Sequence, residues 1–243
     1  MSKRKPELVS IIIPAHNERD NLEVLLERIK CSLEPSAINY EIVVIDDNSD
    51  DGTGEFADTA AAGNKRIRVV HRTGGASFGK TVRAGFAAAK GDVIVPLMGD
   101  LSDDPADILK LLSGLEEGYD VAIGSRFLPE SSVEGYPRLK MLANRCFNTF
   151  AATIFGLGIK DLTNAFKAYR REVLESIPIE SDGFEINAEI PLKAHLLGFT
   201  LVEIPANWQG RKSGVSKLRL GQMGPRYVRV VLDLLFRGVE NLK

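Results

Sequence analysis

The chain has 243 residues, 44% of them hydrophobic, which is enough for one domain with a sizeable core and excludes a disordered or fibrous protein. The 31 Lys and Arg residues nearly balance the 33 Asp and Glu residues, so the net charge of −2 argues against nucleic acid as a partner. The two cysteines, Cys31 and Cys146, are too few for a disulfide scaffold or a thiolate metal cage, and we expect them to be core thiols.

The amino terminus has no core of a secretory signal. Its apolar run ends at Pro14, and no stretch of the chain approaches the roughly 20 apolar residues that a membrane-spanning helix needs. We therefore expect a cytoplasmic protein with no membrane span of its own.

The chain alternates short β-rich runs with segments of helical spacing, which predicts βαβ units around a mainly parallel sheet with helices on both faces. The predicted strands of the first half are residues 9–13, 41–45, 67–70, 92–97 and 121–124. The predicted helices between them are residues 21–32, 54–62, 81–90 and 105–117. In the second half we expect a helix over 137–157, a strand over 163–169, a helix over 186–197 and a strand over 200–204.

Polar residues follow three of the predicted strands. The candidate binding positions in these segments are Pro14, Ala15, His16 and Glu18 after the first strand, Asp46 and Asp47 after the second, and Gly99, Asp100 and Ser102 after the fourth. Ligands of open parallel sheets bind beyond the carboxyl ends of the strands, so the sequence predicts a ligand site on a shared acidic rim.

The carboxylates of this rim suit two kinds of contact. Asp46 and Asp47 can accept hydrogen bonds from a ribose hydroxyl or a base N–H, whereas Asp50 and Asp51 are more typical of a capped turn. Asp100 follows an apolar strand, where a charge is costly unless a cation meets it, and a divalent metal that bridges phosphates would be that cation.

Residues 74–81 match the phosphate-binding pattern G-x-x-x-x-G-K-[ST] and lie between a predicted strand and a predicted helix. This match makes a nucleoside triphosphatase one alternative function. The two acidic strand ends upstream would crowd the same edge with negative charge and favour a simpler interpretation. In that interpretation a glycine-rich turn presents Lys80 or Arg72 to an anionic ligand.

Six segments in order resemble the family-2 glycosyltransferases of the GT-A fold, and in particular the branch of dolichyl-phosphate mannose synthases and polyprenyl-phosphate glucosyltransferases. The segments are SIIIPAHNE, EIVVIDDNSDDGT, MGDLSDDP, GSRF, DLTNAFKAYRREVL and EIPANWQGRKSGVSKL. The resemblance runs from about residue 9 to residue 217. It implies one GT-A domain over 1–243, in which 1–125 bind the nucleotide sugar, 126–217 bind the acceptor and 218–243 form a basic amphipathic tail.

The resemblance also implies roles for single residues. Pro14, His16 and Glu18 would line the nucleotide pocket, with His16 in the place of a common tyrosine, and Asp46 would contact the base or ribose. In the D-x-D metal motif of the family, Met98 replaces the first acid, Asp100 keeps the second, and Ser102 stands where a glutamine ligand is common. The resemblance thus implies a Mg²⁺ or Mn²⁺ site built on Asp100 and Ser102. Because Met98 breaks the motif, the remaining ligands would be diphosphate oxygens and waters, with Asp103 as one candidate for a further ligand.

Basic residues would face the phosphates. Arg126 of GSRF would contact phosphate, with a surface ion pair as the alternative, and Arg211 and Lys217 belong to a segment that closes over the diphosphate in the family. Together with Asp100, these three residues are the expected catalytic groups.

The resemblance implies inverting transfer of one hexose from a GDP-mannose or UDP-glucose type of donor to a polyprenyl or dolichyl phosphate. Such an acceptor is already an anion, so no general base is required. One alternative keeps the fold but uses a carbohydrate or protein hydroxyl as acceptor. Another, suggested by Met98, is a binding subunit without catalysis.

A lipid acceptor predicts a membrane surface as partner and a peripheral location at the inner face of a membrane. Residues 208–243 carry eight Lys and Arg against two acids, and Tyr227, Val230, Val231, Leu234 and Leu235 have near-helical spacing. We expect an interfacial helix there, a second one over 137–157, and a small membrane-anchoring subunit. The alternative for each helix is a stripe that faces the core beside a solvated basic edge.

Overall fold

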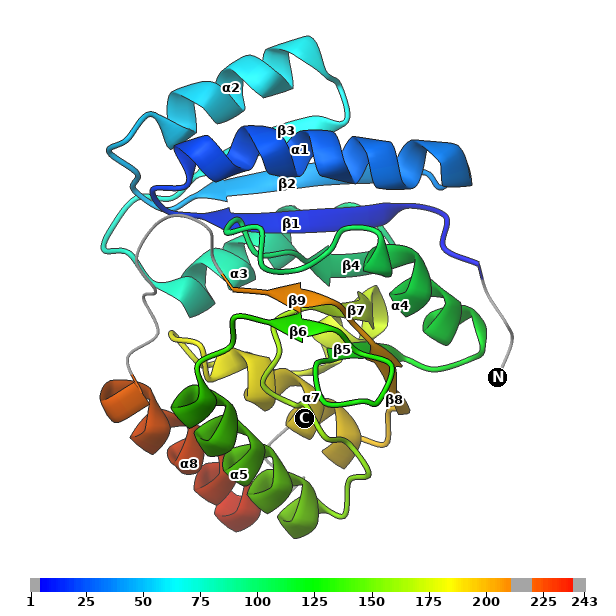
Figure 1. Cartoon of the computed structure of the whole chain (residues 1–243), viewed down its shortest axis with the longest axis vertical. Helices are drawn as coiled ribbons and strands as arrows, with labels where there is room; N and C mark the ends of the chain where they lie inside the picture. The colour runs from blue at the N-terminus through cyan, green and yellow to red at the C-terminus, as the bar shows by residue number, and fades with distance from the viewer. Residues whose placement is uncertain (1–4, 211–219, 238–243) are drawn as a thin grey trace.

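The computed structural model describes residues 5–210 and 220–237, and Arg211 and Lys217 lie outside them. Seven strands form one sheet in the order β3-β2-β1-β4-β7-β5-β8 (Figure 1). The strands are β1 (Val9–Ala15), β2 (Tyr40–Asp46), β3 (Ile67–His71), β4 (Val93–Pro96), β5 (Val121–Ser125), β7 (Lys167–Arg170) and β8 (Leu201–Pro205). Neighbouring strands are parallel except at β7, which pairs antiparallel with both β4 and β5.

Helices cover both faces of this sheet because its central strands are apolar on both sides. Every residue of β1 and β2 is buried, and within β1 the side chains of Ile11 and Ile13 join one core cluster whereas Ile12 joins the other. On the first face lie α1 (Arg19–Leu33), α2 (Thr53–Gly63) and α4 (Asp107–Glu116). On the second face lie α3 (Phe78–Ala88), α5 (Arg138–Phe155), α6 (Arg171–Ser176), α7 (Ile186–Leu196) and α8 (Leu220–Arg237).

The predicted α/β architecture is confirmed, and the structure differs from it in three places. The antiparallel strand β7 starts only at Lys167, so residues 163–166 form a loop rather than part of a strand. Sequence periodicity also missed α6, the short 3₁₀ helix η1 (Glu34–Ser36), and the two-residue strands β6 (Val133–Glu134) and β9 (Trp208–Gln209), which pair in a separate small sheet. The expectation of core thiols is wrong, because Cys31 and Cys146 are both exposed on the outer sides of their helices.

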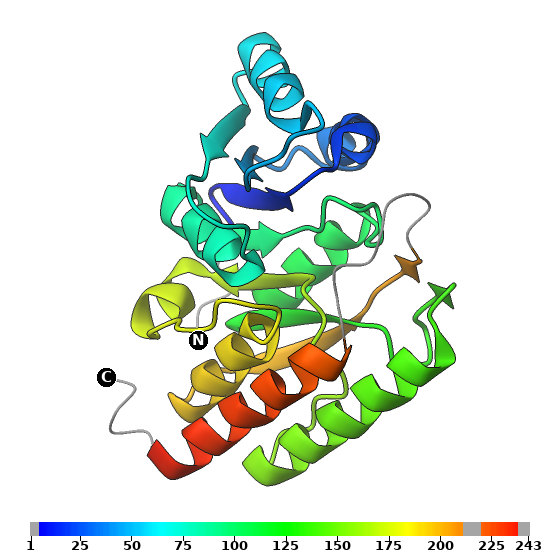
Figure 2. The same cartoon turned by 90° about the vertical axis from the view of Figure 1, so that its left-hand side faces the viewer.

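The two longest helices, α5 and α8, lie side by side at one end of the molecule (Figures 1 and 2). Phe147 of α5 packs edge-on against Tyr227 of α8, with ring centroids 5.1 Å apart. Within the described ranges, no helix combines the length and the apolar composition required to cross a bilayer.

Candidate active site

The parallel register brings the acidic strand ends together. Ala15 at the end of β1 pairs with Asp46 at the end of β2, and Asp46 in turn pairs with His71 of β3. Two adjoining cavities open at this edge, with volumes of about 220 and 590 Å³. Met98 and Phe184 line both of them, so the cavities meet at these two side chains.

The smaller cavity collects most of the residues expected to bind a nucleotide. Pro14, Ala15, His16, Glu18 and Asp47 line it. The His16 ring donates from Nδ1 to the carbonyl oxygen of Asp47 at 2.8 Å, which ties the first strand end to the second. Nucleotide binding by these residues stays a prediction, but they do share one cavity.

Asp46 and Asp47 have different surroundings. Asp46 is buried beside His71, whose Nδ1 lies 3.1 Å from its Oδ2, and Asp46 is not among the residues that line the cavity. Hydrogen bonds to Asp58 and Asp46 raise the pKa of His71, and the ring of His71 contacts both carboxylates. Of the two acids, Asp47 is the one positioned to meet a ligand in the cavity.

The two cations expected to face an anionic ligand are held by other groups. Arg72 donates from Nε to Asp47 Oδ1 at 2.8 Å and from its terminal nitrogen to the carbonyl oxygen of Gly75 at 2.6 Å. Lys80 lies 3.5 Å from Asp182 and lines neither cavity. Arg72 therefore braces Asp47, and Lys80 contacts the chain before α7.

The loop that matches the phosphate-binding pattern is closed by backbone packing. The N–H of Gly79 donates to the carbonyl oxygen of Asp182 at 2.8 Å, and the N–H of Ser77 donates to Asp47 Oδ2 at 2.8 Å. A Cβ at Gly79 would lie 2.3 Å from the carbonyl oxygen of Ser181, so glycine is required there by close contact. Gly79 therefore serves the contact between α3 and residues 181–182, and the N–H groups of Ser77 and Gly79 are already bonded to protein acceptors.

We expect Lys80→Ala to change nucleotide affinity by less than about threefold, because Lys80 forms an exposed ion pair and such pairs contribute little. Calorimetric titration of the variant with GDP and UDP measures this directly. Abolished binding would revive the phosphate-loop interpretation of residues 74–81.

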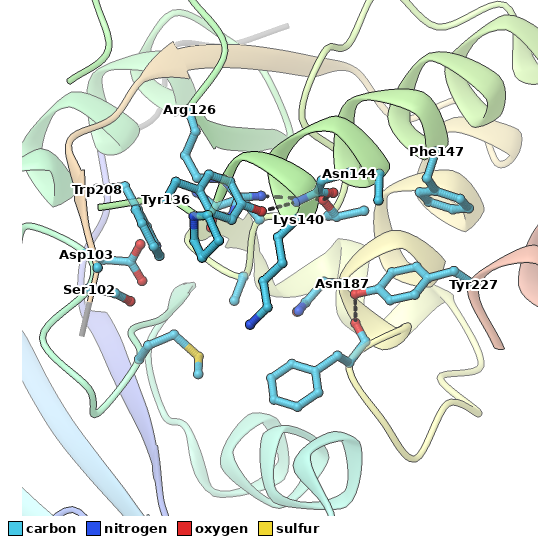
Figure 3. A pocket seen from close by; sticks show the side chains of 18 of the residues that line it. Ser102, Asp103, Arg126, Tyr136, Lys140, Asn144, Phe147, Asn187, Trp208 and Tyr227 are labelled. Carbon is cyan, nitrogen blue, oxygen red and sulfur yellow. Dashed lines mark hydrogen bonds between the residues drawn. The ribbon is translucent and has the colours of Figure 1, made fainter. Parts of the chain in front are cut away.

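The larger cavity begins at the end of β4, where Asp100, Ser102 and Asp103 line it. Figure 3 shows Ser102 and Asp103 at this end of the cavity. The backbone N–H of Ser102 donates to Asp100 Oδ1 at 3.1 Å. Gly99, also buried here, lets this loop approach the first strand end, since a Cβ would lie 3.3 Å from the carbonyl oxygen of Pro14.

Asp103 is the most unusual acid of this site. It is 2% exposed, and its Oδ2 has no hydrogen-bond partner within residues 5–210 and 220–237. Burial and the neighbouring charge of Asp100 raise the pKa of Asp103 to about 7. Carboxylate and hydroxyl oxygens are the ligands that Mg²⁺ and Mn²⁺ prefer, so Asp100, Ser102 and the unpartnered oxygen of Asp103 fit a divalent cation.

Arg126 lines the larger cavity as a fixed group. Its Nε and a terminal nitrogen each donate to Asp161 at 2.8 Å, and both side chains are almost fully buried. Asp161 keeps the pKa of Arg126 above its ordinary range despite the cost of burial. The alternative of a surface ion pair is right about the ion pair and wrong about its location, because the pair lies in the interior beside the cavity.

Sequence reasoning missed several residues of this cavity. Lys140 extends into it from α5, and Asn144 and Phe147 line it from the same helix (Figure 3). Asn144 donates to the hydroxyl oxygen of Tyr136 at 2.6 Å. Lys140, Asn144 and Phe147 follow the i, i+4, i+7 spacing of one helix face, which is the signal that could have found them.

A buried lysine supports the opposite wall of the cavity. Lys167 is 0% exposed, and its ammonium donates to the carbonyl oxygens of Asn164 and Asn187, two residues that line the cavity. Burial lowers the pKa of Lys167 to about 7. The side chain thereby joins the loop before β7 to the first turn of α7.

The family model for glycosyl transferase family 2 matches residues 10–177. This range includes the three strand ends, the acids at the end of β4, Arg126 and Lys140. The chain belongs to glycosyl transferase family 2. Membership in this family argues against the two alternatives from other classes, a nucleoside triphosphatase and a binding subunit without catalysis. The prediction of a glycosyltransferase is confirmed.

Among curated proteins, this glycosyltransferase is 36% identical to a polyprenol monophosphomannose synthase of Mycolicibacterium smegmatis over 222 residues, which cover 88% of this chain and 82% of that protein. It is also 36% identical to a dolichol-phosphate mannosyltransferase of Pyrococcus furiosus over 93% of this chain and 63% of that longer protein. Among solved structures, a glucosyl-3-phosphoglycerate synthase of Mycobacterium tuberculosis with Mn²⁺, UDP and phosphoglyceric acid has a TM-score of 0.70 and 20% identity, over 95% of this chain and 78% of that one. The structural likeness confirms the expected GT-A fold.

Proposed function

We propose that this glycosyltransferase transfers one hexose from a nucleoside-diphosphate sugar to a polyprenyl phosphate, with inversion at the anomeric carbon. The observation that carries the proposal is the larger cavity. It runs from the buried acids at the end of β4 to the apolar side chains of Phe147, Tyr227 and Val228 on α5 and α8. The names of the two curated relatives make mannose the first sugar to test.

The donor would occupy the smaller cavity and the near end of the larger one. Asp47, His16 and Glu18 line the smaller cavity, where the nucleoside would bind. Met98 lines both cavities and lies where the smaller one meets the larger one that contains Asp100. Asp100, Ser102 and Asp103 would hold a Mg²⁺ or Mn²⁺ ion, which when bound offsets the negative charge that develops on the departing diphosphate. The expected phosphate contacts of Arg211 and Lys217 stay a prediction on residues outside the described ranges.

The acceptor would enter from the other end. The ammonium of Lys140 lines the cavity and favours a phosphate there. The guanidinium of Arg126 lines it too, but Asp161 balances its charge, so a phosphate contact of Arg126 stays a prediction. A phosphate oxygen of the acceptor then attacks the anomeric carbon, and the bond from that carbon to the diphosphate oxygen breaks with its electron pair. No proton has to be removed from the nucleophile, which suits a cavity lined by no histidine among the described residues. The functional division that we propose is donor binding by residues 1–125 and acceptor binding by residues 126–217.

A membrane surface would deliver this acceptor. The apolar side chains exposed on the two adjacent helices are Leu139, Leu142 and Phe150 of α5 and Val228, Leu232, Leu235 and Phe236 of α8, and we call them the apolar platform. Arg138 and Arg145 of α5 and Arg226 and Arg229 of α8 are exposed on the same helices and would attract anionic headgroups. We propose a peripheral location at the cytoplasmic face, and the small anchoring subunit stays a prediction.

The platform differs from the stripe expected on the last helix. Val231 and Leu234 are buried in the core and Tyr227 and Val230 are half-buried, so the predicted stripe is mainly the inward side of α8. For these four residues the alternative interpretation, a stripe that faces the core, is therefore correct. Leu235 alone of the five is exposed, together with apolar residues that the periodicity did not single out.

Replacing Leu142 and Leu232 together by serine is expected to weaken binding to anionic phospholipid vesicles about tenfold or more. Each leucine inserted among acyl chains contributes about 1.5 kcal/mol or more when fully buried. Vesicle co-sedimentation measures the loss, and Val24→Ser is the matched control because Val24 is also exposed, at 47%, but lies on α1. Equal losses in the two variants, or none in the double variant, would contradict the platform.

The proposed function is tested by incubating the protein with radiolabelled GDP-mannose or UDP-glucose, a short polyprenyl phosphate and Mg²⁺ or Mn²⁺. We expect one labelled hexose per lipid in the organic phase, with the opposite anomeric configuration to the donor. Retention of configuration, or no transfer from any nucleotide sugar, would overturn the proposal.

A further inference from the structure

Two aromatic rings stand beside the buried acids of the larger cavity. The ring centroids of Tyr136 and Trp208 lie 4.8 Å apart with the planes tilted by 42°, and both rings line the cavity next to Ser102 and Asp103 (Figure 3). Both rings lie between the acids and Lys140 (Figure 3), and neither takes part in the proposed transfer steps.

Trp208 is tied to the loop that carries the acids. Its backbone forms an antiparallel bridge with Asp103, and the next residue, Gln209, donates its N–H to the carbonyl oxygen of Ser102 at 2.8 Å. On the other side, the N–H of Trp208 donates to the carbonyl oxygen of Ser132 at 2.8 Å. These contacts hold the backbone of Trp208 beside the loop proposed to bind the diphosphate.

Tyr136 is fixed as firmly. Asn144 donates to its hydroxyl oxygen at 2.6 Å, and the guanidinium carbon of Arg126 lies 5.3 Å from its ring centroid. A rigid pair of rings offers a preformed apolar surface at low cost in conformational entropy.

The position of this surface indicates its ligand. If the diphosphate lies at the acids and the acceptor phosphate at Lys140, then the hexose lies between them, beside both rings. A pyranose presents a face of C–H groups suited to an aromatic wall, and its hydroxyls require polar partners such as the amide of Asn187, which lines the same cavity (Figure 3). We propose that Trp208 and Tyr136 form the stacking surface for the transferred hexose, an inference that rests on the proposed function.

The sequence supplies a direct probe, because Trp208 is the single tryptophan of the chain. Its fluorescence and calorimetric affinities can be compared for a nucleotide and its sugar, with GDP against GDP-mannose and UDP against UDP-glucose. For the pair that binds, we expect the sugar to change the emission of Trp208 more than the nucleotide alone does.

Trp208→Ala is expected to weaken binding of the nucleotide sugar about tenfold and to change nucleotide affinity less than twofold. Trp208→Phe, which keeps an aromatic face, should recover part of the loss. Equal losses for nucleotide and nucleotide sugar would show that Trp208 only supports the acid loop, and an unchanged affinity for both would exclude stacking. If neither nucleotide binds the wild-type protein, the proposed function falls, and this inference falls with it.

Discussion

Asp100→Asn is expected to lower kcat for sugar transfer by about 100-fold to 1,000-fold, the range typical for loss of one preorganised charge at a reacting centre. Asp100 is 8% exposed and lines the larger cavity beside Asp103. Asparagine keeps the size of the side chain and an oxygen that can accept the hydrogen bond from Ser102, so the change removes the charge and little else.

Asp104→Asn is the matched control, because Asp104 lies in the same loop but its side chain is 37% exposed and pairs with Arg28 at 3.2 Å. We expect near wild-type kcat for this variant. Chelation of divalent cations should lower wild-type activity strongly and cause little further loss in Asp100→Asn. A wild-type rate in Asp100→Asn would show that Asp100 has no role in catalysis.

Asp161→Asn is expected to lower the free energy of unfolding by about 3–5 kcal/mol, because it leaves the buried guanidinium of Arg126 without its counter-charge. Asp161 is 0% exposed and accepts two hydrogen bonds from the Arg126 side chain and one from its backbone N–H. Urea unfolding monitored by circular dichroism measures the change.

An exposed pair provides the control for this prediction. Arg19 and Glu23 form an ion pair on α1 with side chains 36% and 67% exposed, so Glu23→Gln should change the unfolding free energy by less than about 1 kcal/mol. Similar small effects of Asp161→Asn and Glu23→Gln would mean that the Arg126–Asp161 pair is not structurally important.

The first half of the fold could be predicted because its strands are continuous apolar runs separated by helical spacing. Parallel strands then align their carboxyl ends, so the meeting of His16, Asp47 and Asp100 at one edge also followed from the sequence. Strand β7 was harder to predict. Its four residues carry Lys167 and Arg170, and nothing in so short a polar run indicates that it inserts antiparallel between β4 and β5.

The partners of charged side chains could not be predicted from their own positions. The sequence predicts that Arg72 faces an anionic ligand and that Arg126 faces a phosphate, yet each is paired with a carboxylate, Asp47 or Asp161, that is remote in sequence. Lys140 contributes to the cavity only because α5 packs across the far side of the acid site. Such contacts depend on how helices pack against the sheet, and local sequence patterns do not contain that information.

The most direct test of the proposed function is a comparison of two acceptors of equal chain length, a polyprenyl phosphate and the corresponding polyprenol, with the same labelled nucleotide sugar. Transfer to the phosphate alone is the expected result, because the cavity offers the cation of Lys140 and no histidine base among its described residues. Transfer to the alcohol at a comparable rate would contradict the account and favour a hydroxyl acceptor.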